Sequence, residues 1–423
     1  MKSKVYLFLP LLLCCTMALP LYAGELLTWE QCVSEARVTH PDLYAALAQL
    51  QQAEADKQIT GGSLLPQLGL GASSLENGTS EKGGALSSSV SWSLSGKQLL
   101  FDGHKTSNLV SGSEEAINSA RYNYSAVSAS VRFALRSAFS QLLVAQDLVR
   151  LTTEIAERRQ KNVRLINLYY QGGKEHVGSL HQAQADLAQA EFEVSQAQRG
   201  LVLAQAKLAS AIGRDIQNPL RVQGSYSAGD FSSVQPDFAN LAKNNPLFQQ
   251  LVSKSKVAHY DLDVAKSAFS PQLYLTSSVG RSSPDHWPFD AVNWSAGFSL
   301  SVPIYEGGSG RAKVSRAMAV ASQQNALEKS GYLQLLDILE QSWKNYQDAR
   351  LLVVVQKQQL AAATDRSAIA NAQYSNGLVA FNEWVIIENN LVSAKKNFLN
   401  AEANLLIAEA QWIKAKGGGL DGQ

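Results

Sequence analysis

Histidine and cysteine are the side chains of this sequence best suited to metal binding or catalysis, and their spacing favours neither. His176 and His181 are five positions apart, whereas the histidines of a zinc-binding His-Glu-x-x-His helix are four apart. Cys32 is the single cysteine after the first 23 residues, so it can form no internal disulfide. The sequence therefore predicts no metal site and no cofactor.

Two glycine-containing segments approach the pattern of a phosphate-binding loop without matching it. Gly172–Lys174 lacks the upstream glycine of such a loop, because position 168 is Leu168. Gly69 and Gly71 are followed by Ser74, where a dinucleotide-binding loop has its third glycine. We therefore expect a protein that is not an enzyme.

The composition is that of a folded chain with no excess of either charge. Of the 423 residues, 45% are apolar and 17% are charged, against roughly 25% charged residues in an average soluble domain. This excludes a disordered chain, a collagen and a disulfide scaffold. Without Lys2 and Lys4, which lie in a predicted leader, 35 basic residues face 36 acidic ones. Because a nucleic-acid-binding face needs a basic excess, no nucleic-acid partner is expected.

Residues 1–23 have the features of a secretory signal peptide. A basic start precedes an apolar run that ends at Leu21, and the small residue Ala23 stands at the expected cleavage position. An uncleaved membrane anchor is the alternative, although two prolines in the run weaken it. Lipidation at Cys14 is not expected, because Leu13 occupies the place of a small residue. No later run of 18 or more apolar residues follows, so an exported protein without a further spanning helix is predicted.

Self-comparison reveals a tandem repeat with a period of 204 or 205 residues. The matched pairs are His40–Leu43 with Asn245–Phe248, Pro66–Leu68 with Pro271–Leu273, Phe101–Gly103 with Tyr305–Gly307, and Tyr170–Gly173 with Tyr374–Gly377. Four landmarks in the same order are poorly explained by chance. We predict a first structural repeat at 24–218, a connector at 219–234, a second repeat at 235–416 and a C-terminal tail at 417–423.

Each repeat is predicted to hold a helical segment, two strands, a very long helix, a glycine-containing turn and a shorter helix. The first helical segments are Thr28–Thr60 and Pro236–Ser267, and the first long helix runs from His104 to Gly172. That helix would be roughly 100 Å long. A seven-residue repeat along the long helices, polar only at Ser367, predicts coiled-coil packing. Its positions are Leu135, Leu142, Val149, Ala156, Val163 and Tyr170, then Leu339, Tyr346, Val353, Leu360, Ser367 and Tyr374.

The predicted strands alternate between apolar and small polar residues. The clearest runs are Leu86–Leu94 and Val292–Leu300, in which apolar residues, among them Val90, Trp92, Trp294 and Phe298, alternate with serine, asparagine or glycine. Such segments of about ten residues are typical of transmembrane β-barrels; an antiparallel sheet on a soluble core is the alternative. Four strands cannot close a barrel, and open edges are excluded from lipid. If the strands span a membrane, several protomers share one barrel, with the four named side chains facing lipid and the serines facing the lumen.

These features together resemble the TolC-like outer-membrane efflux protein family. The resemblance covers nearly the whole mature chain and includes Pro66 and Pro271 before the outgoing strands, Phe101–Gly103 and Tyr305–Gly307 at the starts of the long helices, and the Tyr-x-x-Gly turns. It also includes Leu208–Gly213, which closes the first repeat. Each motif alone is weak, and their order and spacing make the match specific.

The resemblance implies an α+β membrane protein located in the outer membrane and extending into the periplasm. Four transmembrane strands and long coiled-coil helices per protomer would form a homotrimer, with a 12-stranded β-barrel on an α-helical periplasmic barrel. Such a protein is a passive exit duct of a tripartite efflux or type I secretion system. Its partners would be a periplasmic adaptor (membrane fusion) protein, an inner-membrane transporter and outer-membrane lipid. The alternative is an exported coiled-coil structural or adhesion protein without a channel; the cargo stays open.

The resemblance also implies a gate at the periplasmic tip, around the turns that contain Gly172, Gly173 and Gly377. Tyr374 and Glu383 match the tyrosine and acidic positions of the family's second turn. Val379 stands in place of the family's arginine and Ser179 in place of its first acidic residue, while Glu175 is acidic at a position that does not match. Glu383 is also explained as a helix-start carboxylate favoured by the helix dipole. Three copies of Glu383, with Glu175 nearby, would favour cations in the constriction.

Overall fold

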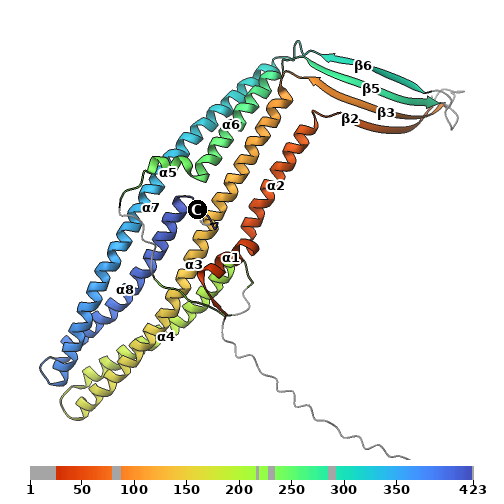
Figure 1. Cartoon of the computed structure of the whole chain (residues 1–423). Helices are drawn as coiled ribbons and strands as arrows, with labels where there is room; N and C mark the ends of the chain where they lie inside the picture. Colours follow the sequence, from red (N-terminus) through yellow and green to blue (C-terminus); the bar gives the residue numbers. More distant parts are fainter. Residues whose placement is uncertain (1–24, 79–86, 216–218, 227–233, 284–291, 422–423) are drawn as a thin grey trace, which may run out of the picture.

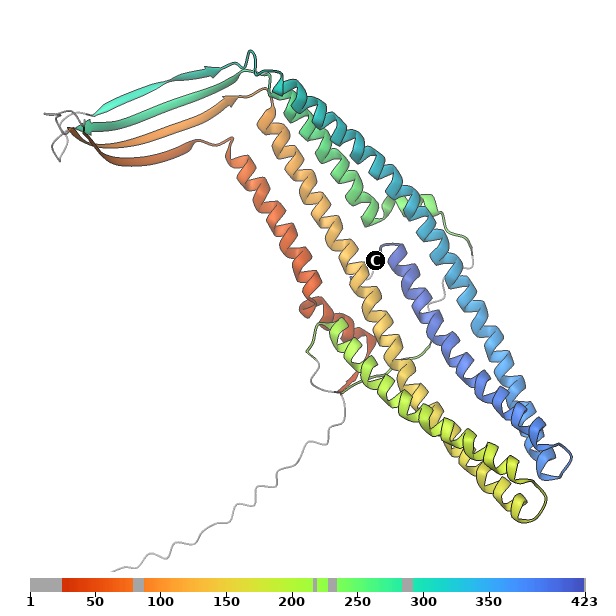
Figure 2. The ribbon, with the colours of Figure 1, turned by 180° about the vertical axis from the view of Figure 1, so that it is seen from behind.

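The computed structural model describes residues 25–78, 87–215, 219–226, 234–283 and 292–421. The expected signal peptide at 1–23 and Leu86 of the expected strand lie outside these residues. The molecule is elongated: a bundle of long helices carries a four-stranded sheet at one end and two helical tips at the other (Figures 1 and 2). The last described residues, up to 421, lie midway along the bundle (Figure 1).

The same order of two helices, two strands, one very long helix and one shorter helix occurs twice. The first set is α1 (Trp29–Thr39), α2 (Pro41–Gly62), β2 (Gln67–Asn77), β3 (Ser87–Phe101), α3 (Lys105–Gln171) and α4 (Val177–Ile212). The second is α5 (Phe238–Asn244), α6 (Pro246–Ser267), β5 (Gln272–Ser283), β6 (Asn293–Ser301), α7 (Ser309–Ser375) and α8 (Phe381–Ala415). Two short strands, β1 (Glu25–Leu27) and β4 (Leu220–Val222), pair in parallel.

The two longest helices, α3 and α7, have 67 residues each, or roughly 100 Å. Two shorter helices pack along each of them, α2 and α4 along α3, and α6 and α8 along α7. Contacts of α3 with both α6 and α8 join the two sets of helices. None of the described helices combines the length and the apolar composition needed to cross a membrane. The helices therefore form a rod in which short helices lie end to end beside long ones.

The expectation of unbroken helices at Thr28–Thr60 and Pro236–Ser267 is wrong. His40 and Asn245 have extended backbone, with ψ angles of 121° and 133°, and a new helix starts at the proline that follows each. Proline disfavours helical geometry in the residue before it and is well suited to the first helical position. Side chains complete the break: His40 Nδ1 accepts a hydrogen bond from the Asp42 amide at 3.2 Å, and Asn245 Oδ1 accepts one from the Leu247 amide at 2.9 Å.

The first two positions of the seven-residue repeat are buried in both long helices. At the last position, the two helices differ in how far the side chain is exposed. Leu135, Leu142 and Leu339 are fully buried. At the last position Tyr374 is 4% exposed, whereas its counterpart Tyr170 is 41% exposed. Within a single chain, Tyr170 therefore does not lie on the packed seam.

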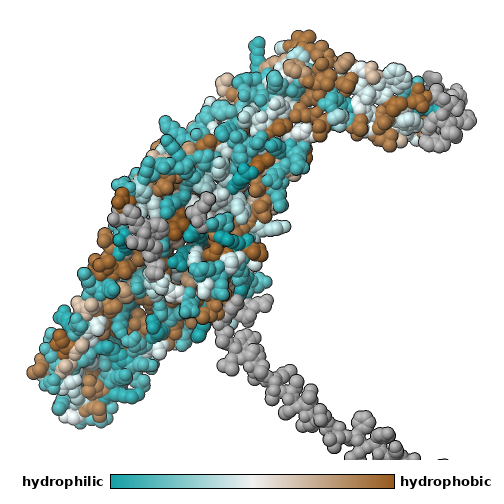
Figure 3. Space-filling view, in the orientation of Figure 1, coloured by the Kyte–Doolittle hydropathy of each residue, from teal (hydrophilic) through white to brown (hydrophobic). Residues whose placement is uncertain are grey.

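The four long strands form one antiparallel sheet in the order β2-β3-β5-β6, with β2 and β6 at its edges. Cross-strand partners pair apolar residues with apolar residues, as in Leu70 with Leu94, Val279 with Trp294, and Leu275 with Phe298. The same registers place Val90 and Trp92 on this face, opposite Ser74 and Ala72. Hydrophobic residues accordingly gather over the sheet and its junction with the helices (Figure 3).

Small polar residues occupy the other face of the sheet. Ser73 and Ser91 are joined through their hydroxyls at 2.7 Å, and Ser278 and Ser295 at 2.9 Å. Because side chains alternate along a strand, each serine lies between two residues of the apolar face. The alternation expected from the sequence is therefore present, and the sheet has one apolar and one hydroxyl-rich face.

The described part of the predicted connector at 219–234 contains the strand β4. Its residue Val222 is held on α3 by Gln146, whose side chain accepts from the Val222 amide at 3.0 Å and donates to its carbonyl at 2.9 Å. The C-terminal segment also packs against α3, where the Leu420 amide donates to Ser128 Oγ at 2.9 Å. The middle of the rod is therefore closed by the connector and the C-terminal segment.

Candidate gate at the helical tip

The two turns at the tip have the same backbone hydrogen bonds. In the first, the Gly173 amide donates to the Tyr170 carbonyl at 3.0 Å and the Lys174 amide to the Tyr169 carbonyl at 2.8 Å. In the second, the amides of Gly377 and Leu378 donate to carbonyls 204 positions after these, at 3.0 and 2.9 Å. Gly173 and Gly377 have φ angles of +67° and +71°, a region that residues with a Cβ rarely adopt. Gly172 has φ −82°, which any residue tolerates.

The helices that follow the turns start differently. The His176 ring accepts a hydrogen bond from the amide of buried Ser179 at 3.2 Å and so caps α4. Helix α8 starts after Ala380, which provides no side-chain cap. Glu383 lies in the first turn of α8 and is exposed. The structure therefore places Glu383 on the surface, outside the buried tip packing.

An aromatic cluster fills the end of the second hairpin. The Tyr374 ring stacks on Trp384, with centroids 4.6 Å apart and planes within 7°. Phe381 and Tyr169 contact the same ring at 6.4 and 5.8 Å. Since Tyr169 belongs to α3, the stack extends across the two hairpins. Tyr374 of α7 is therefore held by rings from two other helices, α8 and α3.

A hydrogen bond joins this buried ring to the other turn. The Tyr374 hydroxyl donates to Glu175 Oε1 at 2.9 Å. Burial, and then the hydrogen bond and the charge of Glu175, raise the pKa of the Tyr374 phenol. The phenol therefore keeps its proton at neutral pH and acts as the donor. The structure thus brings together two of the three residues that the sequence assigned to a gate.

The polar contacts continue from the aromatic cluster into the bundle. Trp384 Nε1 donates to Asn371 Oδ1 at 2.8 Å, and Asn371 Nδ2 donates to Glu388 Oε1 at 3.3 Å. Ser367 Oγ donates to the same oxygen at 2.6 Å. Glu388 is 1% exposed, so its charge needs a buried partner.

That partner is Arg158 of α3. Its guanidinium forms a bidentate pair with Glu388, Nε to Oε2 at 2.5 Å and Nη2 to Oε1 at 2.8 Å. We call the set Arg158, Glu175, Ser367, Asn371, Tyr374, Trp384 and Glu388 the tip network. It runs from α3 through α8 and α7 to the turn between α3 and α4, so it connects the two helical hairpins.

Five members of the tip network were not identified from the sequence: Arg158, Ser367, Asn371, Trp384 and Glu388. One signal was available, because Ser367 is the single polar residue in the seven-residue repeat of the long helices. A polar side chain on a packed seam needs a hydrogen-bonding partner. Among the described residues, no three His, Cys, Asp or Glu side chains lie close enough together to hold a metal ion.

The residues that form the long paired helices, the four-stranded sheet and the two tip turns match the model of a known protein family. The model of the outer membrane efflux protein family matches residues 32–214 and 239–418. The chain belongs to this family. The resemblance expected from the sequence is therefore confirmed, together with the outer-membrane location and the function of an efflux channel. The family comprises channels and not enzymes.

Curated relatives are distant. The pyoverdine export outer membrane protein OpmQ of Pseudomonas aeruginosa is 22% identical over 373 residues, which cover 82% of this chain and 75% of the relative. The cation efflux system protein CusC of Escherichia coli is 24% identical over 383 residues, covering 85% of this chain and 79% of the relative. Both relatives align over most of their length with this outer membrane efflux protein.

Solved structures show the same fold. A crystal structure of CusC has a TM-score of 0.84 at 18% identity and covers 92% of this chain and 91% of that one. The open state of the MtrE outer membrane channel of Neisseria gonorrhoeae has a TM-score of 0.83 at 20% identity, covering 92% of this chain and 89% of that one. The fold expected from the resemblance is therefore confirmed at the level of an outer-membrane efflux channel that is mostly helical with some sheet.

Proposed function

We propose that three copies of this chain form one channel, in which twelve strands make a β-barrel in the outer membrane and the helices make a periplasmic duct. The observation that carries the proposal is the sheet β2-β3-β5-β6, which has two edges and one apolar face. Unpaired backbone groups are too costly in hydrocarbon for an edge to remain open there. Pairing of β6 of one copy with β2 of the next would close the sheet.

The proposal orients the faces of the sheet. Val90, Trp92, Trp294 and Phe298 contact lipid, and the serine face lines the lumen. Trp294 and Phe298 are 78% and 74% exposed in the single chain. An arginine on the lipid face of such a barrel costs about 2–4 kcal/mol near the membrane midplane. Leu94 lies on the same face as Val90 and at the middle of β3, so Leu94→Arg is expected to reduce the trimer yield in the outer membrane far more than Ser95→Arg. Equal yields of the two variants would reject the orientation.

We propose that the tip network keeps the channel closed by holding the two hairpins of each copy together. Tyr374 and Glu175 form the outer link and Arg158 and Glu388 the inner one. The turns with Gly172, Gly173 and Gly377 form the end that an adaptor protein contacts. Glu383, exposed beside that end, adds a carboxylate in each copy and favours cations at the entrance.

Partners and cargo follow from the type of assembly. We propose that the channel works with a periplasmic adaptor and an inner-membrane transporter in a tripartite efflux or type I secretion system. One relative is named for pyoverdine export and another for cation efflux. Because relatives with such different cargoes share the duct, we propose that the transporter selects the cargo.

We also propose that the chain arose by tandem duplication, with repeats at 24–218 and 235–416 and a connector at 219–234. The repeated order of elements and the equal lengths of α3 and α7 support it. Positive φ angles at Gly173 and Gly377, 204 positions apart, are a further sign of common ancestry.

Conductance of the purified protein in planar bilayers tests the proposed channel. We expect discrete channels from an oligomer that dissociates on heating in detergent, with three chains by mass. An exported coiled-coil structural or adhesion protein would give no conductance, would fractionate away from the membrane and would form no heat-modifiable oligomer. A conducting dimer or tetramer would overturn the proposed trimer while leaving the channel function in place.

A further inference from the structure

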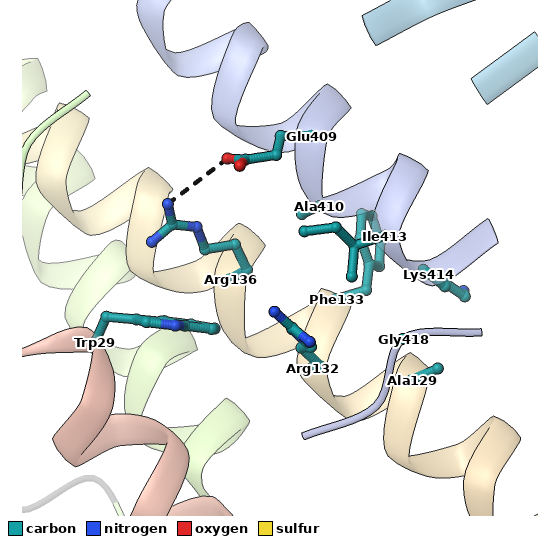
Figure 4. A pocket seen from close by; sticks show the side chains of 10 residues that line it. All are labelled: Trp29, Ala129, Arg132, Phe133, Arg136, Glu409, Ala410, Ile413, Lys414 and Gly418. Carbon is teal, nitrogen blue, oxygen red and sulfur yellow. Dashed lines mark ion pairs between the residues drawn. The ribbon is translucent and has the colours of Figure 1, made fainter. Parts of the chain in front are cut away.

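A hollow of about 170 Å³ lies midway along the bundle, between α1, α3, α8 and the C-terminal segment (Figure 4). Its lining includes Trp29, Arg132, Phe133, Arg136, Glu409 and Lys414. Arg132 and Arg136 project from α3 into the space, with Trp29 on one side and Glu409 on the other (Figure 4). Elements from both halves of the chain therefore meet at one cationic hollow.

Positive charge exceeds negative charge around this hollow. Arg132, Arg136 and Lys414 line it with Glu409 as the one acidic lining residue, and Lys416 lies close enough to interact electrostatically with Arg132. The Arg136 guanidinium is 3.8 Å from the Glu409 carboxylate, longer than an N–H···O hydrogen bond. Exposed Glu30 adds a weaker attraction to Arg136 from outside. One buried carboxylate therefore does not neutralise the cations.

Burial makes this excess of charge unfavourable. Desolvation lowers the pKa of Arg132 and Arg136, and the charge of Arg136 lowers the pKa of Arg132 further. Both guanidinium groups stay charged at neutral pH because their normal pKa lies above 12. Partly buried cations close together are stabilised by an anion between them.

The cations are also held in position. The Arg136 guanidinium lies 4.9 Å from the centre of the Trp29 ring, and Lys414 Nζ lies 5.1 Å from the centre of the Phe133 ring. Arg132 Nη1 donates to the Gly419 carbonyl at 2.8 Å. A guanidinium fixed by its face or by one N–H group presents its other N–H groups as a planar fork that fits carboxylate and phosphate oxygens.

We propose that this hollow binds one oxyanion group, a carboxylate or a phosphate, of a water-soluble ligand. The ligand is not a lipid headgroup, because the hollow is too far from the sheet that we place in the membrane. Arg132 is 27 residues along α3 from Lys105, which puts it about 40 Å below the sheet. The bound oxyanion links α1, α3 and α8 and stabilises the middle of the bundle. The proposal does not depend on the channel being a trimer.

The test uses the full-length protein in detergent, titrated separately with sodium phosphate and sodium acetate at an ionic strength held constant with sodium chloride. We expect saturable binding by calorimetry and a higher melting temperature with phosphate, with acetate or with both. Response to phosphate alone would identify phosphate-bearing ligands, and response to both would extend the class to carboxylates. No binding of either anion beyond the effect of chloride would overturn the proposal.

Variants locate the site. Arg132→Gln and Lys414→Gln each remove one charged donor and are expected to weaken binding about tenfold or more. Arg199→Gln on the exposed face of α4 is the matched control and should bind like the wild type. If Arg132→Gln fails to fold, Lys414→Gln still decides, because Lys414 is only partly buried. Unchanged affinity in Lys414→Gln and in any folded Arg132→Gln would overturn the proposed site.

Discussion

The two helical tips have nearly the same backbone and very different side-chain packing. Both turns use the same hydrogen bonds and a glycine with positive φ. The second tip, however, buries Tyr374 against Trp384, while the first leaves Tyr170 exposed and has Leu180 at the position equivalent to Trp384. Leucine is too small to cover a tyrosine ring as tryptophan does. The same backbone therefore occurs with two kinds of packing. The second tip has a buried aromatic cluster around Tyr374, and the first tip has no equivalent cluster around Tyr170 among the described residues.

Among substitutions at equivalent positions of the two hairpins, the largest difference in effect is expected when the Arg158–Glu388 ion pair is removed. Glu388→Ala removes the carboxylate partner of Arg158, but Arg158 is 34% exposed and keeps its hydrogen bond to Ser367 at 2.7 Å, so the cost lies below the about 3–5 kcal/mol of a fully buried pair. Gln184, 204 positions earlier on α4, is exposed, so Gln184→Ala is the matched control. We expect a lower melting temperature and a higher resting conductance for Glu388→Ala alone. Equal effects of the two changes would show that the inner link does not distinguish the hairpins.

The outer link is expected to have the next largest effect. Tyr374→Phe removes a hydrogen bond to a carboxylate, worth about 1.5–3 kcal/mol, and keeps the ring stack. Tyr170→Phe, at the equivalent exposed position, is expected to be neutral. Resting conductance in planar bilayers measures both. A Tyr374→Phe channel as tightly closed as the wild type would limit the tip network to its inner, ionic part.

The same link predicts a pH response. Because the pKa of Tyr374 is raised in the folded protein, its contribution to stability is complete below the phenol's ordinary pKa of about 10. It is lost as the pH rises above that value toward the folded-state pKa. Resting conductance of the wild type is expected to increase in that alkaline range, and that of Tyr374→Phe to change less. A rise of equal size in both channels would assign the response to other groups.

The two glycines test the shared backbone. A Cβ at positive φ costs about 1–2 kcal/mol, and no atom outside the glycine and its two chain neighbours lies within 4 Å of the Cβ position at Gly173 or Gly377. Gly173→Val and Gly377→Val are therefore expected to impair export to similar extents and to leave trimer formation intact. An export assay with the trimer level as control checks this. Clearly unequal defects would mean that the side chains around each turn, and not φ, limit the substitution.

The smallest effect is expected at Glu383. Glu383→Gln removes an exposed charge in the first turn of α8, a position where a carboxylate is worth about 0.3–1 kcal/mol to the helix. Ser179 is the equivalent residue of α4 and has no charge to lose. We expect reversal potentials across a salt gradient to show reduced cation preference, an effect that shrinks at high salt. Unchanged selectivity would leave Glu383 as a helix-start carboxylate only.

Much of the fold could be predicted from the sequence because local patterns encode it. Apolar residues at every second position predicted the strands and their two faces. The seven-residue repeat predicted the long helices, and glycines predicted the turns at Gly173 and Gly377. The same local reasoning missed the helix breaks at His40 and Asn245, where the proline signals were present but the helical pattern continued across them.

The tip network shows where local reasoning ends. Arg158 and Glu388 are 230 residues apart and Tyr374 and Glu175 are 199 apart, and no periodicity within one helix relates such pairs. The sequence by itself determined the long helices, the long strands and their repetition, because these follow from backbone geometry and side-chain patterning over a few residues. Which tyrosine is buried, which carboxylate is paired and which cations surround a hollow were decided only by how α3 packs against α8 and how α7, α1 and the C-terminal segment pack around them. Those contacts depend on how the whole helices align in space.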